Sequence, residues 1–320
     1  MSISTDEKIA VVGTGLVGRA WSIVFARAGF PVSLYDPVDG AVEQALQLVE
    51  ELLPELAQED LLGGNSPDQV KARLTSAPTL ADALAGAMYV QESAPERLEV
   101  KQELYRELDQ LAEPNTVLAS STSGIPASAF TEGLANRQRC LVAHPINPPH
   151  IVPLVEIVPT PWTDAKVIQK TKALMSQIQQ LPIQLNREVK GFVVNRLQGA
   201  LLAEAFKLVE DGVCNVTDVD AAIANGLGLR WSFIGPFETI DLNSAKGVRG
   251  YCEMLGPLYY ELAQEQADPR PWSEALVNEI DRQRREKLPV EHIGTRQVWR
   301  DQRLAKLVNA KKQADQKLGE

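Results

Sequence analysis

The first half of the chain alternates short apolar runs with longer amphipathic stretches. The apolar runs are bounded by turn-forming residues, which is typical of buried strands. The predicted strands are 8–12, 32–35, 88–91, 116–120, 139–143 and 153–158. Between them, apolar residues recur at helical spacing, and the predicted helices are 16–29, 38–60, 67–73, 97–111 and 166–180. Strands that alternate with helices in this way indicate repeated βαβ units and a parallel sheet.

From Gly191 onward the pattern changes, and no convincing strand follows. Two stretches have the length and spacing of long helices, and three residues suit the first turn or cap of further helices. These features are 191–211, 294–315, Thr217, Pro236 and Ser273. The second part of the chain is therefore predicted to be helical throughout.

A glycine-rich turn follows the first predicted strand. Gly13, Gly15 and Gly18 match G-x-G-x-x-G between a strand and a helix, the context in which this spacing binds a dinucleotide. Gly13 permits the tight turn, Gly15 lets the backbone approach a pyrophosphate, and Gly18 allows close helix–sheet packing. The amides at the helix start, those of Leu16 and Val17, complete an anion site.

An acidic residue closes the next apolar run. Asp36 lies 23 positions after Gly13, at the end of the second predicted strand. A carboxylate there can accept hydrogen bonds from both ribose hydroxyls of an adenosine, and it would repel a 2′-phosphate. The sequence therefore predicts NAD as the cofactor in preference to NADP.

Together these patterns predict an α/β protein of two domains. The first, residues 1–190, is expected to be a Rossmann-type NAD-binding domain, and the second, residues 191–320, an all-helical domain for substrate binding and dimerisation. A length of 320 residues with 44% hydrophobic residues is enough to build a large core in two domains.

The charge distribution restricts the partners of the chain. A net charge of −10 argues against a nucleic-acid-binding surface, which would show a basic face. Residues 281–320 differ, because they hold 11 Lys and Arg against 6 Asp and Glu, a net charge of +5. This basic end is either a solvated helical face or a helix that binds an anion or a partner.

The cysteines, the N-terminus and the longest uncharged run bear on the metal content and the cellular compartment of the protein. The three cysteines have no metal-type spacing and are expected to be free thiols: Cys140, Cys214 and Cys252. The N-terminus lacks a secretory leader, and the longest uncharged run, 140–155, contains four prolines and cannot be a membrane helix. We therefore expect a cytoplasmic protein without metal or membrane contacts.

The first cluster that can carry chemistry is the run of four hydroxyl residues from Ser120 to Ser123. It ends the predicted strand 116–120, at the sheet edge where ligands bind in open α/β sheets. These hydroxyls can donate hydrogen bonds to a substrate oxygen, or they can simply form the following turn.

The second cluster surrounds a proline-rich reversal. His144 ends one apolar strand and Glu156 lies within the next, so that the reversal can bring the two side chains together. A carboxylate would fix the imidazole tautomer and raise its basicity, as a general base near neutral pH requires. The alternative is a structural histidine bonded to a backbone carbonyl, which is how His150 in the same loop is interpreted.

Two further polar residues lie among apolar neighbours. Asn195 comes early in the helix that opens the second domain, and it is either a satisfied core amide or a site ligand. Arg230 is the only charged residue between Asp220 and Glu238, in a glycine-rich and aromatic connection between helices. Its planar guanidinium group can bind a carboxylate through two parallel hydrogen bonds, an arrangement called the carboxylate clamp below. The alternative is a surface arginine on a loop.

In this order, G-x-G-x-x-G, Ser-Ser-Thr-Ser, His-Pro-Ile-Asn-Pro with Glu156, and Gly-Phe-Val-Val-Asn-Arg resemble the 3-hydroxyacyl-CoA dehydrogenase family. The resemblance covers nearly the whole chain. Within the family the sequence is most similar to the λ-crystallin branch, whose enzyme form is an L-gulonate 3-dehydrogenase. The segments that carry this likeness are Ala-His-Pro-Ile-Asn-Pro-Pro, Gly-Leu-Gly-Leu-Arg-Trp-Ser-Phe-Ile-Gly-Pro-Phe-Glu-Thr and Trp-Arg-Asp at 299–301.

The resemblance implies a role for each matching residue. His144 corresponds to the catalytic histidine and Glu156 to the acid that orients it. Ser123 corresponds to the serine that binds the substrate oxygen, and Asn195 to the catalytic asparagine. In a second set, Glu96 and Lys101 match positions that approach the nicotinamide ribose and the mouth of the active site. The family also implies a homodimer formed through the helical domain.

Departures from the family pattern bear on the substrate. The acyl-CoA enzymes have Ser-Asn-Thr-Ser where this chain has Ser-Ser-Thr-Ser, and they lack the Leu-Arg-Trp-Ser-Phe segment that contains Arg230. An arginine beside the substrate makes sense for a free carboxylate, since a thioester carbonyl has no charge to pair. The sequence thus favours a small 3-hydroxy acid, with L-gulonate as the leading candidate, over 3-hydroxybutyryl-CoA.

Three other interpretations stay open. L-carnitine dehydrogenases carry a similar arginine loop, and Trp231 and Phe233 can supply an aromatic cage for a trimethylammonium group. A crystallin-like chain can bind the nucleotide as a structural protein without turnover. Finally, the protein can be an oligomeric scaffold whose basic end recruits a partner.

Overall fold

The computed structural model describes residues 3–319, which separate by their contacts into two compact units. One unit consists of the residues up to Arg196 together with those from Trp299 on, and the other of Leu197–Val298. The two-domain division at 190/191 stays a prediction. By contacts, however, the last helix is divided, and its part from Trp299 on groups with the first unit.

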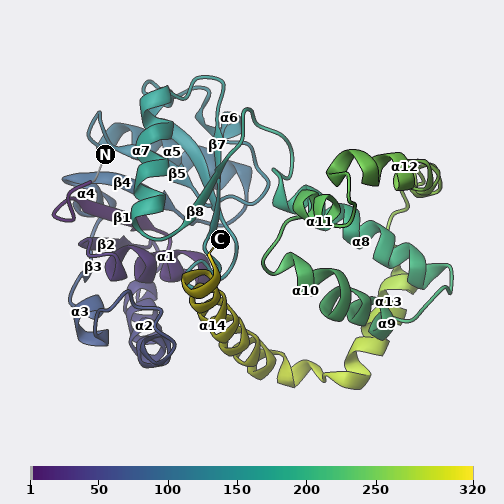
Figure 1. The fold of residues 1–320 in the computed structure, drawn as a ribbon. Helices are drawn as coiled ribbons and strands as arrows, with labels where there is room; N and C mark the ends of the chain where they lie inside the picture. Colours follow the sequence, from purple (N-terminus) through teal and green to yellow (C-terminus); the bar gives the residue numbers. More distant parts are fainter. Residues whose placement is uncertain (1–2, 320) are drawn as a thin grey trace. The chain divides into compact units, whose positions relative to one another are not determined.

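The first unit is built on one eight-stranded sheet (Figure 1). Its strands are β1 (Lys8–Val12), β2 (Val32–Tyr35), β3 (Leu74–Ser76), β4 (Ala87–Glu92), β5 (Val117–Ser120), β6 (Cys140–Pro145), β7 (Leu154–Pro159) and β8 (Leu181–Gln184). Their order is β3-β2-β1-β4-β5-β6-β7-β8, and all neighbours are parallel except β6 and β7. The order reverses between β1 and β4, which places a ligand-binding crevice at the carboxyl ends of these two strands.

Helices cover both faces of this sheet. They are α1 (Leu16–Arg27), α2 (Ala41–Gln58), α3 (Pro67–Lys71), α4 (Leu80–Leu84), α5 (Leu98–Leu111), α6 (Ser128–Thr131) and α7 (Ala165–Gln177), with a 3-10 turn at Arg137–Arg139. In β1, Ile9 and Val11 belong to one buried cluster, with residues of α1, α2 and α7, whereas Ala10 and Val12 belong to a second, with residues of α4 and α5. Burial on both faces explains why the strand is apolar without alternation.

The second unit consists of helices. They are the main part of α8 (Val194–Glu210), α9 (Val216–Ala222), a π-helical turn at Ile223–Leu227, α10 (Gly228–Trp231), α11 (Pro236–Leu242), α12 (Gly247–Gln266), α13 (Glu274–Lys287), a 3-10 turn at Val290–His292 and the start of α14 (Ile293–Leu318). Only Thr239 and Leu276 are fully buried among the residues that the structure describes between 197 and 298. This unit therefore leaves much apolar surface exposed.

The α/β fold and all six predicted strands are confirmed. Pro236 begins α11, and the hydroxyl of Ser273 caps α13 by accepting a hydrogen bond from the Leu276 amide at 3.2 Å. The cap predicted at Thr217 is wrong, because Asn215 occupies that position and its side chain accepts from the Asp218 amide at 3.0 Å. Asparagine is the stronger cap of the two.

The segment that contains Arg230 also differs from expectation. Instead of a loop, residues 223–231 continue α9 through the π-helical turn into α10. A Cβ at Gly228 would lie 2.8 Å from the Ile223 carbonyl oxygen, so glycine at this position allows the wider helical turn. None of the helices within residues 3–319 is long and apolar enough to cross a membrane.

Candidate functional site

The glycine turn has the geometry that dinucleotide binding requires. Gly13 has a φ of +91°, and a Cβ on it would lie 2.7 Å from the Ser93 carbonyl group at the end of β4. A Cβ on Gly18 would lie 1.8 Å from the Gly13 carbonyl oxygen, so α1 can start close against the turn only with glycine there. Gly15 has nothing within 4 Å of its Cβ position, which leaves the turn open where a pyrophosphate would approach.

The carboxylate of Asp36 is held in place at the end of β2. Its Oδ2 accepts hydrogen bonds from the Thr14 amide at 2.8 Å and the Thr14 hydroxyl at 3.1 Å, and its Oδ1 accepts from the Val38 amide at 3.0 Å. A carboxylate has about four lone-pair positions, so these three bonds still leave acceptor capacity for a ribose hydroxyl. The side chain is therefore oriented before any ligand arrives.

A pocket of about 610 Å³ opens between the glycine turn, the end of β2 and helix α5. Its lining includes Gly13, Gly15 and Asp36, together with the apolar side chains of Tyr35, Val38, Leu80, Val100 and Leu104. Anion-binding amides at one end, a ribose-binding carboxylate and apolar walls are the chemistry that the adenosine half of NAD needs. The residues present therefore fit this cofactor.

Most of the four hydroxyl residues after β5 are engaged inside the protein. The Ser120 hydroxyl donates to Glu92 at 2.5 Å, and that of Thr122 donates to Glu96 at 2.7 Å. The Ser121 hydroxyl accepts from the Gln91 amide group at 2.7 Å. Only Ser123, the one residue of the four that is exposed, stays accessible for a ligand.

Glu96 joins the β4–α5 connection to this turn. Its Oε1 accepts from the amides of Ser123 and Gly124 at 3.0 and 3.1 Å as well as from Thr122. Burial alone would raise the pKa of Glu96, but the hydrogen bond from Thr122 and the charge of Lys101 outweigh it and lower the pKa. The carboxylate of Glu96 thus stabilises, through hydrogen bonds, the turn that contains Ser123.

The expectation for Lys101 needs correction. The family resemblance implies a place near the mouth of the site, but the structure buries Lys101, with 1% of its side chain exposed. Its Nζ lies 2.9 and 3.1 Å from the two carboxylate oxygens of the equally buried Glu92, and 3.7 Å from Glu96. A buried ammonium is tolerated only when it is paired, so Lys101 supports the β4–α5 connection from inside.

His144 and Glu156 form the centre of the site. They face each other on the antiparallel strands β6 and β7, and His144 Nδ1 lies 2.7 Å from Glu156 Oε2. Glu156 is fully buried and His144 is 6% exposed. With Nδ1 engaged by the carboxylate, Nε2 makes no hydrogen bond within residues 3–319, and it is the nitrogen available to a substrate.

The other carboxylate oxygen of Glu156 binds the start of α8. Oε1 accepts from the amides of Val193 at 2.8 Å and Val194 at 3.1 Å. Burial alone would raise the pKa of Glu156, but hydrogen bonds from His144 and these two amides outweigh that effect and lower it. The group is therefore a carboxylate at neutral pH, and it ties the dyad to the helix.

The residues before α8 complete the packing around the histidine. Gly191 and Phe192 have φ values of +76° and +49°, which turn the chain sharply into the helix. For a residue other than glycine, this conformation costs on the order of 1–3 kcal/mol. The Phe192 ring is fully buried, and its centroid lies 5.6 Å from that of His144, so the strained residue forms the wall against which the imidazole packs.

The first turn of α8 also reaches the hydroxyl cluster. The Nδ2 atom of Asn195 donates to the Ser123 carbonyl oxygen at 2.6 Å. One continuous network therefore runs from His144 through Glu156 and the start of α8 to Asn195 and Ser123. The amides of Val193 and Val194 are the members that sequence reasoning missed, and the Gly191 turn just before the helix was the available signal.

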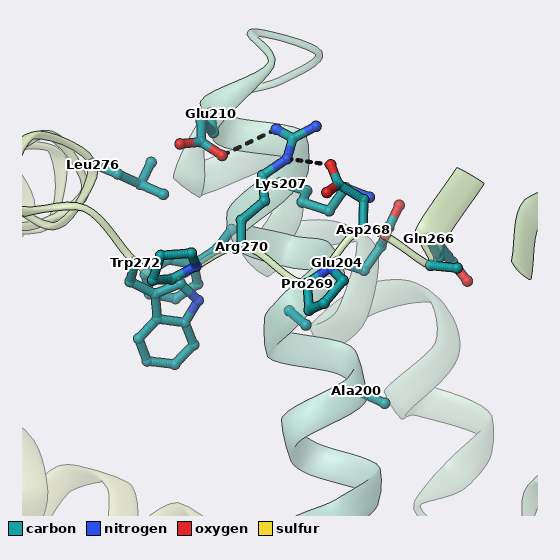
Figure 2. A pocket seen from close by; sticks show the side chains of 14 residues that line it. Ala200, Glu204, Lys207, Glu210, Gln266, Asp268, Pro269, Arg270, Trp272 and Leu276 are labelled. Carbon is teal, nitrogen blue, oxygen red and sulfur yellow. Dashed lines mark hydrogen bonds and ion pairs between the residues drawn. The ribbon is translucent and has the colours of Figure 1, made fainter. Parts of the chain in front are cut away.

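Arg230 belongs to the second unit, whereas the residues of this network belong to the first. It lies exposed in α10 of the second unit and forms no ion pair with the residues that the structure describes. A different arginine, Arg270, lines a pocket of about 440 Å³ between α8 and the segment before α13. Figure 2 shows Arg270 beside Glu210 and Asp268, which lie 3.1 and 2.8 Å away, and Asp211 lies at 2.7 Å. Three carboxylates pair with Arg270, and the other cation of the lining, Lys207, donates to the Glu265 carbonyl oxygen at 3.0 Å.

Two other expectations concern histidine and metal. His150 is buried, and burial next to Arg27 and Arg19 lowers its pKa to about 3, so it is neutral at physiological pH. Its carbonyl oxygen accepts from Arg27 at 2.7 Å, as befits a structural residue. Among residues 3–319, no group of three or more His, Cys, Asp and Glu side chains is arranged to hold a metal ion.

The doubly wound sheet, the glycine turn and the buried histidine–carboxylate pair define a dinucleotide-dependent oxidoreductase. Comparison with known proteins gives its family: the chain belongs to the 3-hydroxyacyl-CoA dehydrogenases. The profile described as "3-hydroxyacyl-CoA dehydrogenase, NAD binding domain" matches residues 8–189, and "3-hydroxyacyl-CoA dehydrogenase, C-terminal domain" matches residues 191–289. The protein is thus an NAD-dependent enzyme that acts on CH–OH groups.

Three relatives illustrate the likeness. Lambda-crystallin of Oryctolagus cuniculus is 38% identical over 308 residues, which cover 95% of this chain and 96% of the relative. L-carnitine dehydrogenase of Oceanobacillus iheyensis is 36% identical over 283 residues and 88% of each chain. The solved structure of 5-formyl-3-hydroxy-2-methylpyridine 4-carboxylic acid 5-dehydrogenase, an NAD-dependent dismutase, has a TM-score of 0.81 at 26% identity and covers 94% of this chain and 96% of that one.

Proposed function

We propose that the protein oxidises the 3-hydroxyl group of a small hydroxy acid with NAD, and that L-gulonate is its substrate. The observation that carries the reaction type is the buried His144–Glu156 pair, with Nδ1 bound at 2.7 Å and Nε2 free. The choice of L-gulonate rests on the resemblance to the λ-crystallin branch.

His144 acts as the general base in this proposal. Its Nε2 takes the proton of the substrate hydroxyl group, and in the reverse direction the same nitrogen returns it. Glu156 holds Nδ1–H and stabilises the imidazolium that forms, while the Val193 and Val194 amides keep the carboxylate ionised. A general base positioned in this way contributes about 10²- to 10⁴-fold to the rate.

Ser123 and Asn195 position the reacting carbon. The Asn195 Nδ2 atom donates to the Ser123 backbone carbonyl oxygen at 2.6 Å, and the Ser123 hydroxyl donates to Glu96 at 3.4 Å. In this proposal the hydroxyl of Ser123 and the side-chain amide of Asn195 hydrogen-bond the substrate oxygen. Glu96 Oε1 holds the backbone of Ser123 in place by accepting a hydrogen bond from its amide at 3.0 Å. Holding the substrate in one orientation accounts for a large part of the rate in such reactions.

The cofactor is held by the glycine turn and the residue that ends β2. The amides of Leu16 and Val17 would bind the pyrophosphate beside Gly15, and Asp36 would accept a hydrogen bond from the ribose. When bound, NAD supplies the hydride acceptor. Glu96 is placed to approach the nicotinamide ribose, as the family resemblance implies.

A free carboxylate on the substrate is supported by Arg230. An exposed arginine without an ion-pair partner is available for an anionic group, and its planar fork binds a carboxylate in bidentate fashion. Two relatives bear names that specify acids of this kind, since carnitine and a pyridine carboxylic acid both carry a carboxylate. A CoA thioester has no charge at the corresponding position.

Replacing this arginine should separate the two substrate classes. Arg230→Ala is expected to raise the KM for L-gulonate about 10- to 100-fold, the loss of one charge-assisted hydrogen-bonded pair. The KM for 3-hydroxybutyryl-CoA should change less than threefold. Arg249→Ala, which removes another exposed arginine of the same unit, serves as the control and should leave both constants unchanged. Equal effects of Arg230→Ala on both substrates would refute the clamp.

L-carnitine is the second candidate substrate. Trp231 and Phe233, on either side of Ser232, are 41% and 66% exposed, and exposed aromatic rings can bind a trimethylammonium group through cation–π contact. A kcat/KM for L-carnitine above that for L-gulonate would select this alternative.

A homodimer formed through the helical unit is part of the proposal. Large apolar side chains are exposed there, among them Phe233, Phe237, Leu242, Met254 and Tyr260, each 62–77% exposed. A monomer rarely exposes so many, and a second copy would cover them. Light scattering after gel filtration should give about twice the chain mass of 35.1 kDa at micromolar concentration. A monomer mass up to 100 μM would contradict the dimer.

A further inference from the structure

The adenosine end of the cofactor pocket carries more negative charge than Asp36 alone supplies. Glu103 and Glu107 line the same pocket of about 610 Å³ from helix α5. They are four residues apart, so they lie one above the other on one face of the helix. Neither forms an ion pair within the described part of the chain, and both are exposed to the solvent of the pocket.

Basic side chains do not offset these carboxylates. Among the described residues, no lysine or arginine lines the pocket. Lys101, on the same helix, is turned inward and bound to Glu92. Arg106 precedes Glu107 by one position, and consecutive residues of a helix point to different faces. The pocket wall therefore has three carboxylates and no cation.

We propose that Glu103 and Glu107 are specificity-determining residues that exclude NADP by repelling its 2′-phosphate. A phosphate monoester carries about −1.5 to −2 charge near pH 7, whereas the 2′-hydroxyl of NAD carries none. Asp36, Glu103 and Glu107 line the same pocket. At 10 mM salt the Debye length is about 30 Å, so the charges of the two glutamates act on a phosphate bound at Asp36. Because the mechanism acts on the adenosine ribose, it is independent of the substrate proposed above.

The test is a binding equilibrium that needs no turnover. NADH and NADPH are titrated by their fluorescence against the wild-type protein, Glu103→Gln, Glu107→Gln and the double variant, at 10 mM and 500 mM NaCl. Glutamine keeps the size of each side chain and removes only its charge. Glu99→Gln is the matched control, because Glu99 is exposed on α5 but does not line the pocket.

The double variant is expected to lower the ratio of the NADPH Kd to the NADH Kd about tenfold at 10 mM NaCl, with each single variant giving a smaller share. At 500 mM NaCl the difference from wild type should fall below twofold, because salt screens exposed charges. Glu99→Gln should change the ratio less than twofold at either concentration.

Three results would overturn the proposal. The ratio can stay unchanged in the double variant, which would assign exclusion to Asp36 alone. NADH binding can weaken as much as NADPH binding, which would make these side chains contacts of the adenine ring. Lastly, Glu99→Gln can shift the ratio as much as the pocket variants, which would make the effect one of net charge.

Discussion

His144→Ala is expected to lower kcat about 10²- to 10⁴-fold while the Kd for NADH changes less than threefold. The substitution removes the imidazole nitrogen that is proposed to take the hydroxyl proton. It leaves the glycine turn and Asp36 untouched, since the turn joins β1 to α1, Asp36 directly follows β2, and neither shares a hydrogen bond with His144. Steady-state kinetics with NAD⁺ and NADH fluorescence measure the two quantities separately.

His292→Ala is the control for this variant, because His292 is exposed and distant in sequence from the site. It should keep both kcat and the NADH Kd. Retained turnover in His144→Ala would show that another group accepts the proton. Joint loss of turnover and NADH binding would mean that His144 supports the fold of the site rather than the chemistry.

Glu156→Gln is expected to have the second largest effect, a fall in kcat of at least about 10²-fold. In the wild type, the Val193 and Val194 amides donate to Glu156 Oε1 at 2.8 and 3.1 Å. A glutamine oxygen can still accept both of these hydrogen bonds. The amide nitrogen would then face His144 Nδ1 as a donor. The imidazole must accept there and carry its proton on Nε2, which makes it unable to act as a base.

The same variant has a pH signature. Because the pKa of Glu156 is lowered in the folded protein from 4.5, its carboxylate stabilises the fold at pH values above the unfolded pKa. That contribution is lost as the pH falls through the folded pKa. Urea unfolding should therefore show the wild type more stable than Glu156→Gln at pH 7, with the gap narrowing below about pH 4.5.

Glu132→Gln, at an exposed residue that ends α6, should show neither the loss of kcat nor the narrowing gap. If Glu156→Gln kept its kcat, the carboxylate would be a structural anchor of α8. If the stability gap instead widened at low pH, the pKa of Glu156 would be raised in the folded protein, contrary to the hydrogen bonds described above.

Periodicity was sufficient to predict the central strands, because burial on both faces makes them continuously apolar. It did not predict the edge strands β3 and β8. β3 is three residues long with two exposed hydroxyl side chains, and β8 contains Pro182 and exposed Leu181. Short strands at a sheet edge, with few buried residues, carry little apolar pattern, and proline is tolerated there.

In the site, the side chains proposed to take part in the reaction could be predicted from the sequence. The buried ion pair and the backbone hydrogen bonds that support them could not. His144 and Glu156 are joined by a short reversal, so sequence proximity brought them together. Lys101 was placed at the site mouth because its motif matched, but only the fold shows Glu92 buried beside it. The Val193 and Val194 contacts are made by backbone amides, so the types of these two residues do not indicate them, and the glycine at 191 is the one sequence signal for the turn before the helix.

We propose that this site oxidises a small 3-hydroxy acid rather than a CoA ester. The most direct measurement is kcat/KM with NAD⁺ for L-gulonate, L-carnitine, L-3-hydroxybutyrate and 3-hydroxybutyryl-CoA on the same preparation. We expect the highest value for L-gulonate, at least about tenfold above that for the CoA ester. A higher value for 3-hydroxybutyryl-CoA than for all three free acids would contradict it.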